Sequence, residues 1–284
     1  MLEPEHQGRQ RKDLAEALRG LRLASGLSGA RLAVRCAMSQ AKISRIETGK
    51  TLPTVIDVER ILQALEVPGE VTREMLALAR TANVDYTAWR TYARLGLYQK
   101  QAELKALEKS PTFMRHFLPG VPTGLLHVRE YATETLTPSV RTEAARDISR
   151  VVQARMDRQA VLDDPDRRFV FLLTEQAVRW ATASRPVLAA QAEHMARVSG
   201  KPNVEIAIIP QGTYIREVPL NVFVIYDDRL VTVELFSGEV VLRNPQDISH
   251  HIALFDLFLS HALRGAEATA FLRRCADEFM RVRE

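Results

Sequence analysis

The sequence has little cysteine, no long apolar run and no apolar segment near its first residue. Only two of its 284 residues are cysteines, Cys36 and Cys275, and each falls within an apolar helical pattern. They do not form a disulfide framework, which fits a reducing cytoplasm. No apolar stretch approaches the roughly 20 residues that cross a bilayer, so we expect no transmembrane helix and no membrane partner. The opening MLEPEHQGRQRKD lacks the apolar core of a secretory signal, so none is expected.

Motifs of the common enzyme classes are also missing: the sequence contains no GxxxxGK(S/T), GxGxxG, GxSxG or HExxH. His250 and His251 are neighbours that diverge by about 100° on a helix, so with His261 they do not converge as metal ligands. The aspartates of 163–166 lack the glycine and distal glutamate of a calcium loop and are interpreted as a solvated turn. We expect no catalytic residue, metal or cofactor, and no enzyme, unless residues 110–284 bring titratable groups together in a deep polar pocket.

Positive charge is concentrated near the N-terminus rather than spread over the chain. The net charge is only +4, but residues 9–50 contain ten lysines and arginines against three acidic residues, a local charge of +7. Such a concentration points to a polyanion partner. A solvated basic helix face explains the charge equally well, so charge alone does not decide between the two.

Hydrophobic spacing predicts five short helices in residues 10–80. Ser28 and Ser39 are typical N-caps of the second and third helices, and Gly49 is a typical stop for the third. A fourth apolar stripe covers 55–65, and a fifth helix follows it. These elements predict a small all-α domain.

The remaining residues are expected to form a linker helix, 81–110, and an α+β domain, 111–284. In the second of these, helical stretches alternate with runs of β-branched residues. Turn residues separate the last three runs, which predicts antiparallel hairpins in a sheet of four to five mostly antiparallel strands. The expected strands are 168–173, 204–209, 221–226, 230–236 and 239–242, and the expected helices are 127–136, 141–162, 189–198, 247–263 and 267–282.

The second and third predicted helices have the pattern of a helix-turn-helix unit. Two short helices cross closely only where a small residue lies at the crossing, and Ala33 supplies that residue. Leu32, Ile43 and Ile46 supply the apolar contacts, and the turn between the helices is three or four residues long. The polar residues of the second helix are then directed outward.

The outward residue types of 39–48 suit the major groove of DNA. Ser39, at the helix N-terminus, can meet a phosphate. Gln40 can pair with an adenine edge, Arg45 with a guanine edge, and the methyl group of Ala41 can touch a thymine methyl. The expected DNA-binding residues are Ser28, Ser39, Gln40, Ala41, Lys42, Ser44, Arg45 and Lys50, of which the two lysines are placed for phosphates.

The run LRLASGLSGARLAVRCAMSQAKISRIETGKTLPT resembles the helix-turn-helix of Cro/CI-type repressors, the xenobiotic-response-element family. The resemblance covers about residues 10–80 and implies a five-helix, lambda-repressor-like fold. It also implies a partly buried salt bridge between Arg22 and Glu47, which ties the first helix to the recognition helix. Ala37 replaces the left-handed glycine usual in the family, at a cost of about 1–2 kcal/mol if that conformation is kept. The alternative is a generic helical bundle with solvated charges.

The rest of the chain, about residues 85–280, resembles the large domain that follows such modules in bacterial antitoxin-like transcriptional regulators. The similar stretches include PGVPTGLLHVREYA, RMDRQAVL, LTEQAV, NVEIAIIP and VTVELF. The resemblance implies a regulatory or interaction domain, often paired with a small partner protein.

Two functional hypotheses stay open. In the first, the protein is a sequence-specific, homodimeric transcriptional regulator whose two recognition helices read half-sites about one helical turn apart. Its residues 111–284 then respond to a partner or effector. In the alternative, an antitoxin-like C-terminal domain mainly binds a small partner protein, and DNA binding serves autoregulation. Both place the protein in the cytoplasm with double-stranded DNA as a partner, at the nucleoid when DNA is bound.

Overall fold

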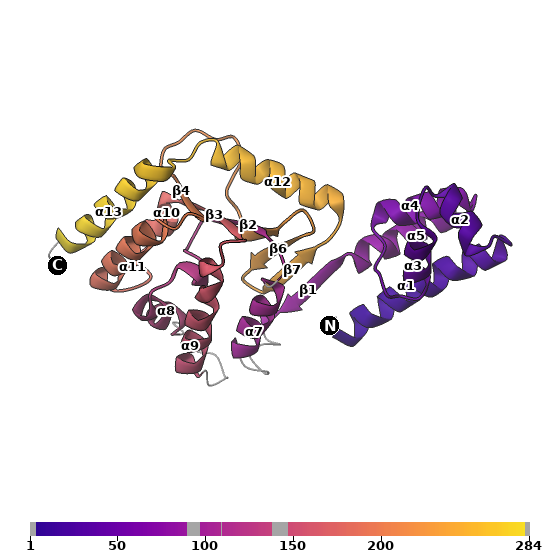
Figure 1. Cartoon of the computed structure of the whole chain (residues 1–284), viewed down its shortest axis with the longest axis horizontal. Helices are drawn as coiled ribbons and strands as arrows, with labels where there is room; N and C mark the ends of the chain where they lie inside the picture. The colour runs from indigo at the N-terminus through magenta and orange to yellow at the C-terminus, as the bar shows by residue number, and fades with distance from the viewer. Residues whose placement is uncertain (1–3, 90–96, 109, 138–146, 282–284) are drawn as a thin grey trace. The chain divides into compact units, whose positions relative to one another are not determined.

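A computed structural model describes residues 4–89, 97–108, 110–137 and 147–281 (Figure 1). The chain divides into two compact units. The first comprises Met1–Tyr86 with Val240–Ile248, and the second comprises Thr87–Glu239 with Ser249–Glu284. Among the described residues, none of the helices combines the length and the apolar character that a bilayer crossing requires.

The first unit contains the five expected helices, and three of them begin at hydroxyl N-caps. Ser28 and Ser39 accept a hydrogen bond from the backbone N–H three residues on, at 3.3 and 3.2 Å, as predicted. Thr54 and Asp57 form a reciprocal capping box. Gly49 follows the third helix with a left-handed φ of +67°. The helices are α1 (Pro4–Ala24), α2 (Gly29–Arg35), α3 (Gln40–Glu47), α4 (Val55–Ala64) and α5 (Gly69–Ala82).

Apolar side chains from the five helices form the core of this unit. Leu18 of α1, Leu32 of α2 and Ile43 of α3 are each 1% exposed, and Ile46 of α3 is fully buried. Burying a side chain of this size stabilises the fold by about 1.5–3 kcal/mol. The two isoleucines therefore hold α3 by one face and leave its other faces outward.

The expected linker helix over 81–110 is wrong in part. Residues Val84–Ala88 form strand β1, and helix α7 begins only at Leu97 and ends at Leu107; residues 90–96 lie outside the described part. Just after β1, the backbone N–H of Trp89 donates to the carbonyl of Ser237 at 3.1 Å, and its indole N–H donates to Leu235 at 2.8 Å. These partners are about 150 residues away, so local periodicity does not reveal them.

The second correction concerns the sheet, which has seven strands in the described residues and is mixed. Its order is β1-β7-β6-β5-β2-β3-β4. Strands β2, β3 and β4 are parallel neighbours, whereas β5 is antiparallel to both β2 and β6. The sequence prediction missed β1 and β2. The remaining strands are β2 (Phe113–Leu118), β3 (Arg168–Thr174), β4 (Val204–Ile209), β5 (Phe223–Tyr226), β6 (Leu230–Leu235) and β7 (Gly238–Leu242).

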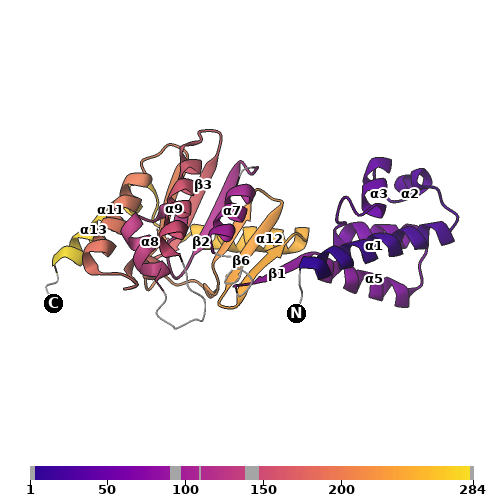
Figure 2. The ribbon, with the colours of Figure 1, turned by 90° about the horizontal axis from the view of Figure 1, so that it is seen from below.

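Helices lie on both faces of this sheet (Figures 1 and 2). Phe117 of β2 stacks on Phe258 of α12 with ring centroids 4.6 Å apart, so α12 covers one face. Met114 and Leu118 alternate with Phe117 along β2 and pack on the opposite side with α11 and α13. The helical elements are η1 (Gly124–Leu126), α8 (Arg129–Leu136), α9 (Ile148–Arg158), η2 (Gln159–Asp163), α10 (Glu175–Arg179), α11 (Arg185–Val198), α12 (Pro245–Leu259) and α13 (Gly265–Arg281).

Candidate DNA-binding face and a polar cavity

The helix-turn-helix directs one face of α3 into the core and another into solvent. Ile43 and Ile46 are buried, and Figure 2 shows α1 lying between α3 and α5. The hydroxyl oxygens of Ser28 and Ser39 accept the capping hydrogen bonds, which leaves each O–H able to donate to a phosphate. The side chains of α3 that are exposed are Gln40, Ala41, Ser44 and Arg45, and Lys50 is exposed just beyond it.

A bidentate ion pair ties α3 to α1. The Arg22 guanidinium donates to the two carboxylate oxygens of Glu47 at 2.6 and 2.9 Å, and a third hydrogen bond runs to the carbonyl of Leu27 at 2.9 Å. The two side chains are 12% and 11% exposed. The hydrogen bonds that Arg22 donates to Glu47 raise the pKa of Arg22 above its ordinary value. This is the salt bridge that the sequence resemblance implies, and it fixes the orientation of α3 relative to α1.

Lys42 has a role that the sequence did not indicate. Its ammonium donates to the carboxylate of Asp57 at 2.7 Å, and Asp57 is itself 5% exposed and caps α4. Lys42 therefore links α3 to α4 as well as facing outward with 37% of its side chain exposed. A substitution at Lys42 changes the fold and the surface charge together, so it does not isolate a phosphate contact.

Ala37, in the turn between α2 and α3, keeps the left-handed conformation with a φ of 52°. The turn shape of the helix-turn-helix is thus retained without glycine. Beside it, Cys36 is buried, and its thiol lies 3.7 Å from the carbonyl of Arg60. Burial raises the pKa of that thiol, which keeps it protonated and unreactive at neutral pH.

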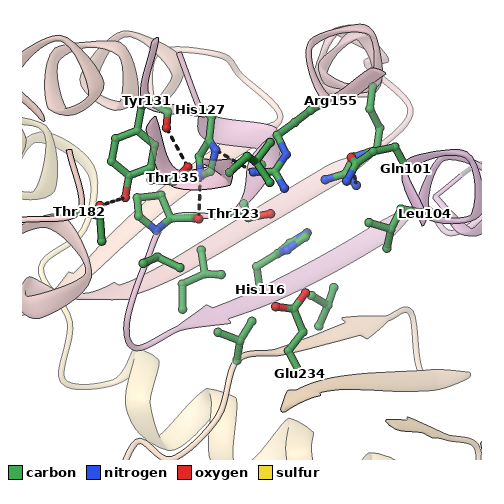
Figure 3. A pocket seen from close by; sticks show the side chains of 18 of the residues that line it. Gln101, Leu104, His116, Thr123, His127, Tyr131, Thr135, Arg155, Thr182 and Glu234 are labelled. Carbon is green, nitrogen blue, oxygen red and sulfur yellow. Dashed lines mark hydrogen bonds between the residues drawn. The ribbon is translucent and has the colours of Figure 1, made fainter. Parts of the chain in front are cut away.

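A polar cavity of about 600 Å³ lies within the second unit (Figure 3). Its floor is the sheet face formed by β2, β5 and β6, and its walls come from α7, α8, α9 and the segment 121–127. This volume is in the range of small-molecule sites. The charged, polar or aromatic side chains that line it include Gln101, Glu108, His116, His127, Tyr131, Arg155, Arg158, Thr182, Tyr226, Thr232, Glu234 and Glu239.

Arg155 projects from α9 into this cavity, where its nearest polar partner is a histidine. Its Nη1 lies 3.1 Å from Nδ1 of His127, whose Nε2 in turn lies 3.0 Å from the carbonyl of Pro122. Burial, together with Arg155, lowers the pKa of His127 to about 3, so this ring is neutral and accepts from Arg155. Burial lowers the pKa of Arg155 to about 10, which leaves it charged at neutral pH. Among the described residues, no carboxylate forms an ion pair with Arg155, although Glu234 is near enough to oppose the lowering of its pKa, and the Nε of Arg155 has no hydrogen-bond partner.

The loop that carries His127 is held in place from two sides. The side-chain amide of Gln159 donates to the carbonyls of Gly124 and His127 at 2.9 and 2.8 Å. Gln191, which is buried, donates to the carbonyl of Leu126 at 2.6 Å. A Cβ on Gly124 would lie 2.9 Å from Cδ of Arg155, so glycine is what permits the close approach of that arginine. The cavity wall is therefore preorganised.

Two further groups on the inner side of the cavity are buried without complete partners. His116 of β2 is 2% exposed, and neither ring nitrogen has a hydrogen-bond partner among the described residues. Burial, with Arg158 nearby, lowers its pKa to about 3. Arg158 donates to Gln101 at 3.1 Å, and its Nε lies 3.5 Å from a carboxylate oxygen of Glu108. Burial raises the pKa of Glu108 to about 7, against the opposing effect of Arg158.

Glu234 faces Arg155 across the cavity, as Figure 3 shows. Glu234 is an exposed residue whose carboxylate faces the cavity, where partial loss of hydration and the nearby charge of Glu239 raise its pKa above the ordinary value. The two glutamates differ in their partners, because Glu239 forms an ion pair with Lys100 whereas no hydrogen bond to the Glu234 carboxylate is present in the described residues.

Sequence reasoning missed the whole cavity. Its residues come from β2, β5, β6, α7, α8, α9 and the segment 121–127, so no short spacing brings them together. The run PGVPTGLLH was singled out by resemblance, and it is the loop that holds His127. Elsewhere, His250 is exposed and His251 packs its ring edge against Phe223. In the part of the chain that the structure describes, no group of three histidine, cysteine or acidic side chains has the arrangement of a metal site.

Comparisons with known proteins agree with the two-part organisation. A helix-turn-helix domain family matches residues 13–75, which makes the chain a DNA-binding regulator of the helix-turn-helix class. A second family, described as a domain of unknown function (DUF5753), matches residues 101–274. Because that match covers more than half of the sequence, the chain belongs to the DUF5753 family. No curated protein matches the chain.

Three solved structures show weak similarity. One is a phospholipase D family member, Nuc from Salmonella typhimurium, with 11% identity, a TM-score of 0.34, and coverage of 64% of this chain and 95% of that one. The second is NucT from Helicobacter pylori, with 11% identity, a TM-score of 0.35, and coverage of 63% and 97%. The third is TrmBL2, an archaeal chromatin protein, with 13% identity, a TM-score of 0.32, and coverage of 73% and 66%. Similarities this weak do not establish a shared fold.

Proposed function

We propose that the protein is a sequence-specific transcriptional regulator of the Cro/CI-type, with residues 39–48 in the DNA major groove and with a C-terminal domain that responds to an effector or partner. The observation that carries this proposal is the arrangement of α3. One face is anchored by Ile43, Ile46 and the Arg22–Glu47 pair, and the opposite face exposes side chains that can read base edges. The protein acts in the cytoplasm, at the nucleoid when DNA is bound.

The positive charge of residues 9–50 supports the same proposal. A local charge of +7 suits the phosphate backbone, which dominates the affinity of such proteins and makes it salt-dependent. One helix-turn-helix buries too little surface for specificity at a single gene, so the regulator acts as a homodimer. Two-fold symmetry then predicts half-sites separated by about one helical turn of ~34–36 Å.

Selection of bound duplexes from a random pool, followed by footprinting, tests this proposal. The expected result is enrichment of an inverted repeat with about 10 base pairs between the half-site centres. Recovery of unrelated sequences, with no protected half-sites at low ionic strength, would overturn it.

One observation favours a second candidate function, the antitoxin-like binding of a small partner protein. In the second unit, Val218, Leu220 and Phe236 are 66%, 77% and 109% exposed. Large apolar side chains that are this exposed are available for contact with another protein. Light scattering of the purified chain separates the alternatives: a stable dimer supports the regulator, whereas a monomer that co-purifies with a small protein from its host supports the antitoxin-like reading.

We also propose that the cavity binds a molecule rather than transforming it. Titratable groups converge in this cavity, so an enzymatic function has to be considered. Nucleophilic catalysis uses a hydroxyl or thiol hydrogen-bonded to a base, and in the described residues neither His116 nor His127 has such a partner. Release of a product from a bound ligand would favour an enzyme instead.

A further inference from the structure

The polar cavity lies in the second unit, which does not contain the helix-turn-helix, and it holds ionisable groups that a purely structural core avoids. A buried charge is stable only when it is paired and hydrogen-bonded. Arg155 is half-buried, and it has one neutral histidine as its partner and a buried Nε without one. His116 is 2% exposed with two unsatisfied ring nitrogens, and it lines the same space. These groups lack an anion and hydrogen-bonding atoms that a ligand can supply.

The position of the unpaired groups indicates the chemistry of that ligand. On one side of the cavity, the Arg155 guanidinium and the His127 ring are fixed by the loop 122–127 and by α9. On the other side, Glu234, an exposed residue of β6, faces Arg155 without an ion pair to it (Figure 3). An arginine fork suits the oxygens of a carboxylate or phosphate. A carboxylate without a donor suits an ammonium or hydroxyl group.

We propose that this cavity binds a small organic molecule that carries an oxyanion group, held by Arg155, and a hydrogen-bond donor such as an ammonium group, held by Glu234. This proposal assigns a chemical class to the effector of the proposed regulator. It depends on that function only for the effect of the ligand on DNA binding, since binding itself is measured without DNA.

Two other occupants fit the cavity less well. A metal ion has no set of three suitable ligands in the part of the chain that is described. A purely apolar ligand would leave Arg155 and His116 unsatisfied, so it would not remove the cost of burying them. The shared requirement is an oxyanion, and phosphate and carboxylate compounds are the two sources to compare.

Thermal unfolding of the full chain, at constant ionic strength and without DNA, tests the site with four probes. These are inorganic phosphate, O-phosphoethanolamine, β-alanine and ethanolamine, each compared with chloride. A ligand at 100 times its Kd raises Tm by about 5–10 °C in a domain of this size. We expect the two zwitterionic probes to raise Tm, phosphate to do so at higher concentration, and ethanolamine to have no effect. A larger shift with O-phosphoethanolamine than with β-alanine identifies phosphate as the oxyanion source, and the reverse order identifies carboxylate.

Variants assign the two ends of the ligand. Arg155→Met should lose the response to all oxyanions, and Arg155→Lys should retain part of it. Glu234→Gln should keep the response to phosphate but lose the advantage of O-phosphoethanolamine over phosphate. Arg197→Met is the matched control, because Arg197 is an exposed arginine on α11, and it should respond like the wild type.

The stability of the unliganded variants separates a binding role from a structural one. Because no carboxylate of the described residues forms an ion pair with Arg155, Arg155→Met should have a Tm equal to or above that of the wild type when no probe is present. A large fall in Tm for Arg155→Met would show that the arginine is structural and would overturn the proposal. So would an equal response of wild type and Arg155→Met, or no response of the wild type to any oxyanion. If the chain binds oxyanions through Arg155 but does not bind DNA, the proposed ligand site is supported and the proposed regulator is overturned. If the chain binds its operator but no oxyanion, the regulator is supported and the ligand site is overturned.

Discussion

Replacing Arg22 by methionine tests how α3 is held against α1. In the wild type, the guanidinium donates two hydrogen bonds to Glu47 and one to the carbonyl of Leu27. Arg22→Met leaves the Glu47 carboxylate, which is 11% exposed, without its partner. Removing one member of a fully buried pair costs about 3–5 kcal/mol. Because about a tenth of each side chain is exposed, we expect about 2–3 kcal/mol of destabilisation in the first unit.

Hydrogen exchange of the backbone amides of α1 and α3, measured by mass spectrometry on the full chain, reports this change locally. A loss of 2–3 kcal/mol corresponds to exchange that is about 30- to 150-fold faster. Helices α11 and α13, in the other unit, serve as the internal control and should not change. The double variant Arg22→Met with Glu47→Met should lose less than the sum of the single variants, because each removes the same interaction. The reasoning is refuted if exchange in α3 accelerates by less than about threefold, which is ~0.6 kcal/mol, or if the two losses add.

Three further predictions concern single side chains. Ala37→Gly should raise the free energy of unfolding of the first unit, measured in urea, by about 0.5–1 kcal/mol. The left-handed φ of 52° costs alanine about 1–2 kcal/mol, and the greater backbone entropy of glycine in the unfolded chain offsets part of the gain from removing that cost. A fall in stability would show that the turn relaxes. Gly124→Ala should destabilise the second unit by about 1–3 kcal/mol and reduce the rise in Tm that oxyanions cause. The reason is that the new Cβ would lie 2.9 Å from Cδ of Arg155. An unchanged response to oxyanions would mean that the Arg155 side chain moves aside without losing its function. Glu108 has a pKa of about 7 in the folded protein, above its ordinary value of 4.5. Its contribution to stability is therefore fully present below pH 4.5, and the protein loses about 3 kcal/mol of stability as the pH rises to 7. Glu108→Gln should remove that loss, so its Tm should exceed that of the wild type at pH 8 but match it near pH 4.5; parallel curves would contradict the assignment.

The parts of the fold that could be predicted are those fixed by local chemistry. Ser28, Ser39 and Gly49 act within one helical turn, so their capping roles followed from the sequence. The Arg22–Glu47 pair spans 25 residues and was expected only through the family resemblance. The partnership of Lys42 with Asp57 was not expected, because it depends on how α4 packs beside α3.

The parts that were missed depend on distant contacts. Strand β2 carries Arg115 and His116 at buried positions, and their polarity concealed a strand that is covered on both faces. Its parallel pairing with β3 joins segments about 55 residues apart, which hairpin signals do not reveal. The cavity combines His116, Arg155 and Glu234 from three such segments, so it emerged only from the folded chain.

The most direct test of the central claim is the change in base specificity when Arg45 is replaced by alanine. Fluorescence anisotropy on the selected operator and on each single-base variant of it gives the comparison. Loss of a bidentate base contact should weaken operator binding by about 1–3 kcal/mol and remove discrimination at one base pair of each half-site. Lys50→Ala should weaken all duplexes alike and reduce the salt slope by about 1, and Arg73→Ala, on α5, should change neither. An equal loss on operator and random duplex for Arg45→Ala would contradict the assignment of α3 as the helix that reads the sequence.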